Sequence, residues 1–418
     1  MIFFFMQFGF HANFIYSAQW YLETATKTIL VHYYSGLILT YVGLTIGFVI
    51  GRYTFLKKDI YPKPIILPVN VKKNEKIITI LIISYTLLFI FFGASDRLQI
   101  ILQYFRFEGV HSYTEIRRIL FKDTAIMNLS AFTRYTISSI LFAVAVGTYI
   151  VRGKNVLLYA FLCLTLFLFC VLQLNKLVYI YYFVLTILVF THVKIEMGKI
   201  KINNVLIFKY IKISILVILL LIGLIFMQYR ALLEGNIDRY KYIFDLISYR
   251  LFISNHDALV MFYEMYPDIK PYTYFDNIGL IMKTIGAEAR TPSLEVPIYF
   301  FDLNLNFTSV QSGFIASSYA SFGFFGILFN SIVIPLLLLY LVRCSLNIKS
   351  SLFRGIFVAL VGLNTYFLTS SQFHTALLSG GVLFIPIIFY ISRIFILVLR
   401  KNSPKSTYIR KANEKYYV

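Results

Sequence analysis

Charged residues are scarce in this sequence. Asp, Glu, Lys and Arg make up 14% of the 418 residues, 59% are apolar, and the mean hydropathy is +0.75. A water-soluble domain of ordinary composition carries far more charge. The apolar runs are continuous over about twenty residues, the length of a membrane-spanning helix, and they lack the alternation of a β-barrel strand. The sequence therefore predicts an all-α, polytopic membrane protein.

Acidic residues are scarcer still, with 19 Asp and Glu against 39 Lys and Arg and a net charge of +20. The basic residues gather in short loops between apolar runs, so the excess charge does not indicate a nucleic-acid partner. Five segments hold 23 Lys and Arg against 4 Asp and Glu. Short loops rich in Lys and Arg stay in the cytoplasm. We therefore place on the cytoplasmic side residues 52–76, 152–154, 194–212, 343–354 and 400–418.

Alternating spans between these loops gives about ten transmembrane helices. Residues 1–228 are the N-terminal membrane helices, with residues 2–19 as a first span, and residues 229–308 are one large extracytoplasmic loop with short helices. Residues 309–399 are the C-terminal membrane helices, followed by a basic cytoplasmic tail, 400–418. The clear spans are Tyr33–Gly51, Ile77–Ala94, Leu129–Val151, Val156–Leu174, Leu177–Val193, Ser214–Gln228, Gln311–Leu341, Leu352–Thr369 and Leu377–Leu399.

Several kinds of site are missing from the sequence. Three cysteines give no disulfide framework. The large loop has no Asp-x-Asp pair and no two histidines at zinc-ligand spacing, so we expect no metal. The cytoplasmic loops contain no Gly-rich phosphate loop, which excludes an ATP or nucleotide-sugar site, and no cofactor is expected. Any substrate must then be reached from the outer side, and lipid-linked molecules are the natural candidates.

The large loop concentrates the charge that the spans lack, with ten of the 19 acidic residues. Its arginines carry planar, permanently charged forks that suit phosphate, and the alternative is a simple salt bridge to a loop carboxylate. Two more cations lie at the outer membrane boundary. They would either bind a lipid diphosphate, which offsets the cost of burial, or snorkel to the headgroups. The candidate substrate-binding cations are Arg134, Lys176, Arg230, Arg239 and Arg290.

Apolar residues at helical spacing predict a helix over residues 249–264. Arg250 and Asp257 are seven residues apart and therefore share one face of it. His256 is the only histidine in the loop, and a histidine or a carboxylate is what an acceptor hydroxyl needs as a general base. We predict Arg250, His256 and Asp257 as catalytic residues. The alternative is that Asn255 and Asp257 cap the start of a surface helix.

The most distinctive run is NFTSVQSGFIASSYASFGFFG, residues 306–326. Gly313, Ser317 and Ser321 form a small-residue stripe at four-residue spacing, which permits close helix approach. Helix packing explains the glycines, whereas so many hydroxyls suggest a wet or re-entrant segment. The run follows the large loop and precedes the basic tail by two helices. In this it resembles the bacterial O-antigen and capsule repeat-unit polymerases (Wzy family), which commonly show a small, polar run ending in aromatic-Gly-x-x-Gly.

The resemblance implies a metal-independent glycosyltransferase of the bacterial inner membrane, with a cytoplasmic C-terminus. It would transfer a growing glycan from undecaprenyl diphosphate to the next lipid-linked repeat unit, with a chain-length regulator and a flippase as partners. The likeness in topology covers the whole chain, and the likeness in sequence covers residues 225–330. The two Arg-x10-Gly loop motifs of some members do not occur here, so no catalytic residue transfers through them.

Three other readings of the sequence stay open. An O-antigen ligase shares the layout but transfers the glycan to the lipid A core or another acceptor. A flippase or other transporter tends to show internal repeats and charges at the membrane midplane, whereas the polar residues here concentrate in one outer loop. A structural scaffold is disfavoured by the paired charges of that loop.

Overall fold

The computed structural model describes residues 27–56, 80, 84, 135–152, 176–198, 254–301, 313–348, 350–377 and 380–390. Some of the predicted features fall outside these ranges. They are the first span 2–19, all but two residues of the span 77–94, the whole spans 156–174 and 214–228, the basic tail, and the candidate residues Arg134, Arg230, Arg239 and Arg250.

The part of the chain that the structure describes is helical and contains no β-strand. Three helices are long and apolar enough to cross a membrane: α3 (Lys27–Phe55), α16 (Gly313–Leu346) and the Ser351–Leu368 portion of α17 (Ser351–Ser370). They confirm the all-α class and support membrane association. The other helices are α8 (Ile137–Arg152), α10 (Lys176–Glu196), α13 (Ser254–Met265), α14 (Gly279–Thr284), α15 (Pro292–Phe301) and α18 (Phe373–Leu377).

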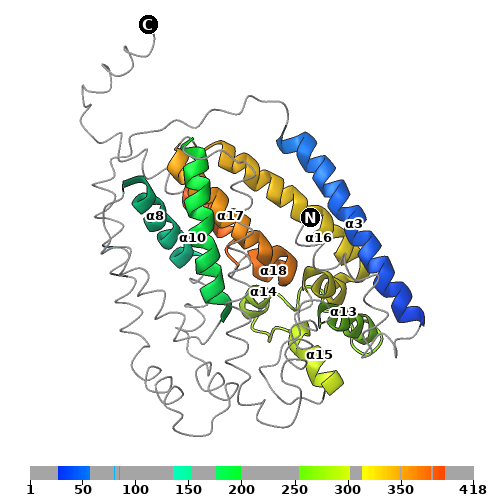
Figure 1. The fold of residues 1–418 in the computed structure, drawn as a ribbon. Coiled ribbons are helices and arrows are strands. Elements are labelled where there is room, and N and C mark those ends of the chain that lie inside the picture. Colours follow the sequence, from blue (N-terminus) through cyan, green and yellow to red (C-terminus); the bar gives the residue numbers. More distant parts are fainter. Residues whose placement is uncertain are drawn as a thin grey trace, which may run out of the picture.

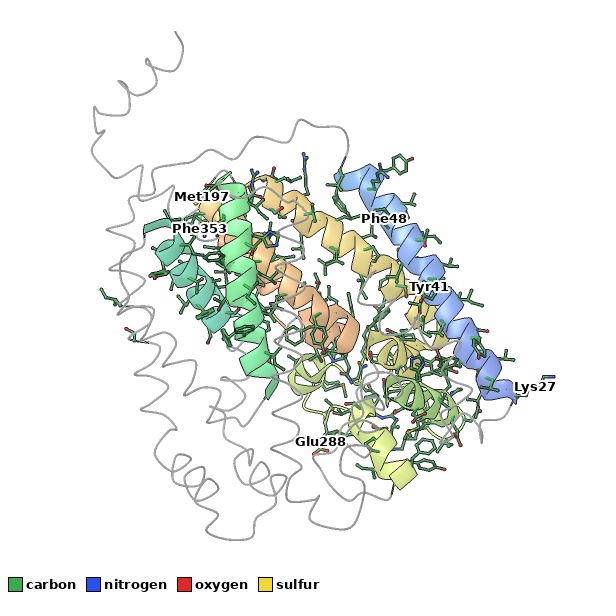
Figure 2. All side chains as sticks on the ribbon, in the orientation of Figure 1. Lys27, Tyr41, Phe48, Met197, Glu288 and Phe353 are labelled. Carbon is green, nitrogen blue, oxygen red and sulfur yellow. The ribbon has the colours of Figure 1, made fainter. Side chains whose placement is uncertain are left out.

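The long helices form one bundle with the short helices at one end (Figure 1). α3 packs along α16, α17 packs against both α16 and α10, and α8 packs against α10 and α17. Met197 and Phe353 mark one end of the bundle, and Lys27 and Glu288 lie toward the other (Figure 2). The helices α13, α14 and α15, which all belong to the predicted large loop, gather at this second end.

Glycines on α3 let its backbone approach α16 closely. Gly43, Gly47 and Gly51 recur every four residues on one face, and all three are buried. A Cβ at Gly43 would lie 2.5 Å from the Cβ of Ser331, and a Cβ at Gly47 would overlap the carbonyl oxygen of Ile332. Small residues at this spacing are a common way to pack membrane helices, because the helices gain van der Waals contact along their backbones.

A buried asparagine joins the other side of the bundle. Asn364 of α17 is fully buried and accepts a hydrogen bond of 2.5 Å from the hydroxyl of Tyr181 in α10. Its Nδ2 donates to the carbonyl oxygens of Gly380, at 2.8 Å, and Tyr135, at 3.2 Å. The side chain therefore links α10, α17, the start of α8 and the turn after α18, and its amide is satisfied on both sides.

α16 is not the single straight span expected over Gln311–Leu341. Its backbone leaves helical geometry at Phe322 and Gly323, and Gly323 has φ +60, a region that favours glycine. Asn330 donates a 2.7 Å hydrogen bond to the Oγ of Ser318, yet residues this far apart on a straight helix are about 18 Å apart. The first half of α16, Gly313–Ser321, therefore folds back beside the second half, and all its residues are buried.

Candidate functional site

Helix α13 lies inside the molecule rather than on its surface. Residues 256–263 are all buried, and the helix packs against α3, α15 and α16. A surface helix would instead expose one polar face. The helix predicted over 249–264 is confirmed from Ser254 onward, while the interpretation of it as a surface helix is wrong.

His256 sits at the contact between α13 and α3. Its ring is 1% exposed, and its Nδ1 forms a short hydrogen bond with the hydroxyl of Tyr33, which is fully buried. Asp257 is buried next to it and interacts electrostatically with Tyr33. Leaving a buried polar group of this kind unpaired costs roughly 1–3 kcal/mol in proteins, so the hydrogen bond stabilises this arrangement of the two side chains. The tyrosine therefore fixes the orientation of the imidazole ring.

A shell of aromatic rings surrounds this pair. Tyr263, two turns along α13, packs edge-on against Tyr319 with ring centroids 4.3 Å apart. Its hydroxyl lies against Gly36 of α3, where a side chain would overlap it, and it has no hydrogen-bond partner within the ranges given above. Burial raises the pKa of Tyr263 well above its ordinary value, and the neighbouring Tyr319 and Tyr33 act in the same direction. This hydroxyl is therefore a neutral group at neutral pH.

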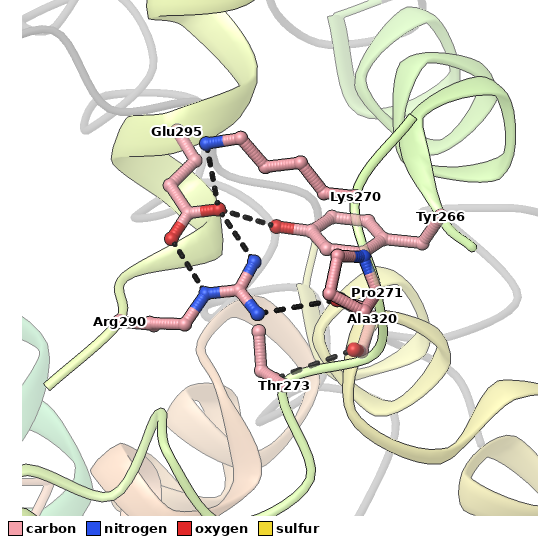
Figure 3. Close-up of polar contacts among 7 residues, drawn as sticks. All are labelled: Tyr266, Lys270, Pro271, Thr273, Arg290, Glu295 and Ala320. Atoms are coloured by element: carbon pink, nitrogen blue, oxygen red, sulfur yellow. Dashed lines mark hydrogen bonds and ion pairs between the residues drawn. The ribbon is translucent and has the colours of Figure 1, made fainter. Parts of the chain in front are cut away.

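The loop after α13 closes the break in α16. The backbone N–H groups of Thr273 and Tyr274 donate to the carbonyl oxygens of Ala320, at 2.8 Å, and Ser321, at 3.0 Å. Asn277 donates to the Oγ of Ser321 at 2.7 Å, and Figure 3 shows the contact between Thr273 and Ala320. Carbonyl groups left open at the end of a helix need such partners. The large loop is thus hydrogen-bonded to the run that carries the family resemblance.

Arg290 belongs to a separate charged cluster around Glu295 (Figure 3). Its Nε and Nη2 donate to the two oxygens of Glu295 at 3.1 and 3.0 Å, and its Nη1 donates to the carbonyl oxygen of Pro271. Lys270 and the hydroxyl of Tyr266 also donate to Glu295, at 3.2 and 3.1 Å. Burial alone would raise the pKa of Glu295, but the bonds and charges of Arg290 and Lys270 outweigh it and lower that pKa.

This cluster matches the salt-bridge alternative for Arg290. A forked guanidinium that already holds a carboxylate through two bonds has little left to offer a phosphate. Arg290 instead ties the start of α15 to the loop before α14. The cluster joins α15 to the loop between α13 and α14, and the pKa of Arg290 is raised chiefly by its bond with Glu295.

The structure brings some of the predicted residues together and separates others. His256 and Asp257 lie in one buried group, and Arg290 lies in the Glu295 cluster. Lys176 begins α10, one turn before Tyr181, and Arg134 immediately precedes Tyr135. The rings of Tyr135 and Tyr181 are 4.9 Å apart, so the starts of α8 and α10 are neighbours.

Tyr33, Asn364 and the glycine face of α3 were not predicted from the sequence. The glycines gave a signal, since Gly43, Gly47 and Gly51 repeat at four-residue spacing. An asparagine inside an apolar span was also a signal, because such a residue must find a partner. Tyr33 gave none, since tyrosines abound in this chain and nothing in the sequence pairs it with a histidine 223 positions away.

Comparison with protein-family models, curated proteins and solved structures found no match.

Proposed function

We propose that this protein polymerises lipid-linked oligosaccharide repeat units, of O-antigen or capsule type, at the outer face of the bacterial inner membrane. The proposal includes about ten membrane spans, an extracytoplasmic loop over 229–308 and a cytoplasmic C-terminus. The growing glycan would be transferred from undecaprenyl diphosphate to the next lipid-linked unit.

One observation carries the proposal: a histidine of the large loop is held by a tyrosine of a candidate membrane span. His256 and Tyr33 bring a titratable base to the end of α3 where the outer helices gather. A lipid-linked sugar has its reactive carbon at that depth, next to the diphosphate. A base in water, far from the bilayer, could not reach it.

The reaction needs one proton transfer and one bond exchange. The acceptor hydroxyl oxygen attacks the anomeric carbon of the donor glycan, and the bond from that carbon to the diphosphate oxygen breaks. The proton of the hydroxyl passes to His256, and undecaprenyl diphosphate leaves with the bonding electron pair. In this step Nδ1–H would donate to the hydroxyl oxygen of Tyr33 and fix the ring, which leaves the lone pair of Nε2 free to accept the proton. Because His256 is buried, side chains around it must move to admit the acceptor.

Cations would stabilise the leaving diphosphate. Lys176 and Arg134 are two candidates, because Lys176 begins α10 and Arg134 precedes in sequence Tyr135, whose ring packs against Tyr181 of α10. Arg230, Arg239 and Arg250 of the large loop are the other candidates, with Arg250 as the catalytic one. Arg290 contributes least, because Glu295 already engages it.

The break in α16 favours a second candidate, a flippase or other transporter. Transporters commonly use discontinuous helices whose open backbone groups bind the substrate or an ion. In α16 the carbonyl oxygens of Ala320 and Ser321 instead bind backbone N–H groups of the loop. A break that is closed in this way suits a structural junction better than a transport site, and the polymerase remains our preferred function.

The test is surface glycan length in a deletion strain that carries wild type, Arg250→Ala or His256→Gln at equal membrane level. Polymerisation predicts glycans of a single repeat unit with both variants, since loss of a general base slows such reactions about 10²–10⁴-fold. His374→Gln, a half-buried histidine on α18, is the matched control and should restore long glycans.

Two other outcomes would replace the proposal. Loss of all surface repeats, with lipid-linked units accumulating on the inner side, would mean flipping. Long glycans that stay on the lipid carrier and never reach the final acceptor would mean ligation.

A further inference from the structure

An exposed group of aromatic rings lies where the large loop meets the break in α16. Tyr274 and Phe275 are 55% and 57% exposed. Both rings pack edge-on against Phe322, with centroids 5.7 and 5.2 Å away. We call Tyr274, Phe275 and Phe322 the aromatic patch. A contiguous exposed patch of apolar side chains commonly marks a binding surface.

The patch lies at the level of the end of a candidate span. Phe324, two residues after Phe322, packs against His32 of α3 with ring centroids 5.5 Å apart. Tyr34, two residues after His32, is 44% exposed and is followed on α3 by exposed Ile38 and Val42. A tyrosine at the end of an exposed apolar helix face is where membrane helices place their interfacial aromatic residues.

The patch also continues the exposed face of α16. Phe325 is 70% exposed, and it stacks on exposed Phe329 with ring centroids 6.2 Å apart. These residues follow Phe322 on a helix that is apolar and long enough to span a bilayer. An apolar helix surface of this kind faces lipid, so the surface next to it meets the boundary between lipid and water.

We propose that the aromatic patch inserts into the outer interface of the bilayer and anchors the large loop there. Its partner is lipid: the rings would lie at headgroup depth, with their apolar faces on the upper acyl chains. The backbone bonds from Thr273 and Tyr274 to the end of the first half of α16 hold the patch at that depth. The anchor is independent of the reaction proposed above.

The test measures contact between single tryptophans and lipid in the full-length protein. The chain has one tryptophan, Trp20, so Trp20→Phe gives a silent background. Phe275→Trp and Tyr274→Trp report on the patch, and Phe325→Trp is the positive control. Tyr299→Trp, at an exposed site on α15, is the loop reference. The tryptophan fluorescence of each variant is measured in nanodiscs of phosphatidylethanolamine and phosphatidylglycerol. It is compared between lipids with plain acyl chains and lipids with brominated acyl chains.

Bromine should quench the two patch reporters nearly as strongly as Phe325→Trp and should leave Tyr299→Trp almost unchanged. Quenching of Phe325→Trp without quenching of either patch reporter would overturn the proposal, because the patch would then face water or a protein. Equal quenching of all four would also overturn it, since the whole loop would touch lipid. An unquenched Phe325→Trp would remove the premise that α16 faces lipid.

Discussion

The bundle is held along two seams that work differently. Between α3 and α16, buried glycines along α3 let main chain meet main chain, and Gly47 lies directly on the backbone of Ile332. Between α10 and α17 there is one such approach, at Gly355 against Val193, where a Cβ would lie 2.7 Å from the Val193 Cα. The opposite end of that seam is held by Asn364, which accepts a hydrogen bond from Tyr181 of α10 and also donates to the carbonyl oxygens of Tyr135 and Gly380.

The difference shows two ways to join helices where lipid removes the usual hydrophobic driving force. At the glycine seam the backbones of the two helices make close dispersion contacts, and there is no room for a side-chain atom at the glycines. A buried asparagine that links several helices, which we call the asparagine node, tolerates changes in the shape of its neighbours. The protein loses stability when a donor or acceptor of this node is left without a partner. The first seam should therefore fail by steric overlap, and the second by loss of polar pairing.

The strongest break in the glycine seam is Gly47→Ala. The new methyl group would overlap the Ile332 carbonyl oxygen, and overpacking of this kind costs about 1–3 kcal/mol or more. We expect a large fall in the thermal unfolding midpoint of the purified protein in detergent. Gly362→Ala on α17 is the matched control, since nothing lies within 4 Å of the added group. It should be neutral or stabilising by about 0.5–1 kcal/mol, because alanine favours helix. Equal shifts for both variants would refute the close-packed seam.

The asparagine node is tested by Asn364→Leu. This change leaves the hydroxyl of Tyr181 and the carbonyl oxygens of Tyr135 and Gly380 without their bonds, so we expect a loss of about 2 kcal/mol. Tyr181→Phe removes one of these bonds and should cost about 0.6 kcal/mol, the average for such bonds in membranes. Thr365→Val, at the neighbouring position, removes only an exposed bond to the carbonyl oxygen of Gly362 on the same helix and should have little effect. If Asn364→Leu were as stable as Thr365→Val, the node would be unimportant.

The smallest effect is expected at the charged cluster outside the bundle. Glu295→Gln weakens the bonds from Arg290 and Lys270 and should cost about 0.5 kcal/mol at neutral pH, because ion pairs of partly exposed side chains add at most about 1 kcal/mol. The pKa of Glu295 lies below its ordinary value of 4.5 in the folded protein, so its contribution is present above that value and is lost as the pH falls through the lower folded pKa.

Thermal unfolding between about pH 6 and pH 3 checks this sign. The wild type should lose stability faster than Glu295→Gln as the pH falls. Glu288→Gln, at an exposed carboxylate, should follow the wild type. Parallel curves for wild type and Glu295→Gln would mean that the cluster adds nothing to stability.

The helices were the easiest part of the fold to predict. The ranges expected at Tyr33–Gly51, Leu177–Val193 and Leu352–Thr369 each lie inside a helix, namely α3, α10 and α17. Continuous apolar composition explains this, because a chain in lipid must satisfy its backbone groups within the helix. The prediction of one straight span over Gln311–Leu341 was wrong, because hydropathy contains no information on the dihedral angles of Phe322 and Gly323.

The candidate site was harder to predict because its parts come from distant positions. His256 could be singled out as the only histidine of the loop, but its partner Tyr33 looks like any other tyrosine of an apolar helix. The charge of Arg290 suggested phosphate binding, whereas the fold placed Glu295 within 3.0 Å of it. Residue type shows what a side chain can bind, and its neighbours decide what it does bind.

The sequence by itself determined that the chain is apolar and that its described part is helical, because composition and run length fix where backbone hydrogen bonds must be made. It also marked the large loop as the place where charge collects. Only the tertiary structure decided that α13 is buried, that α16 folds back on itself, and that Tyr33 holds His256. These features depend on contacts between residues far apart in the chain, and such contacts leave no periodic trace in the sequence.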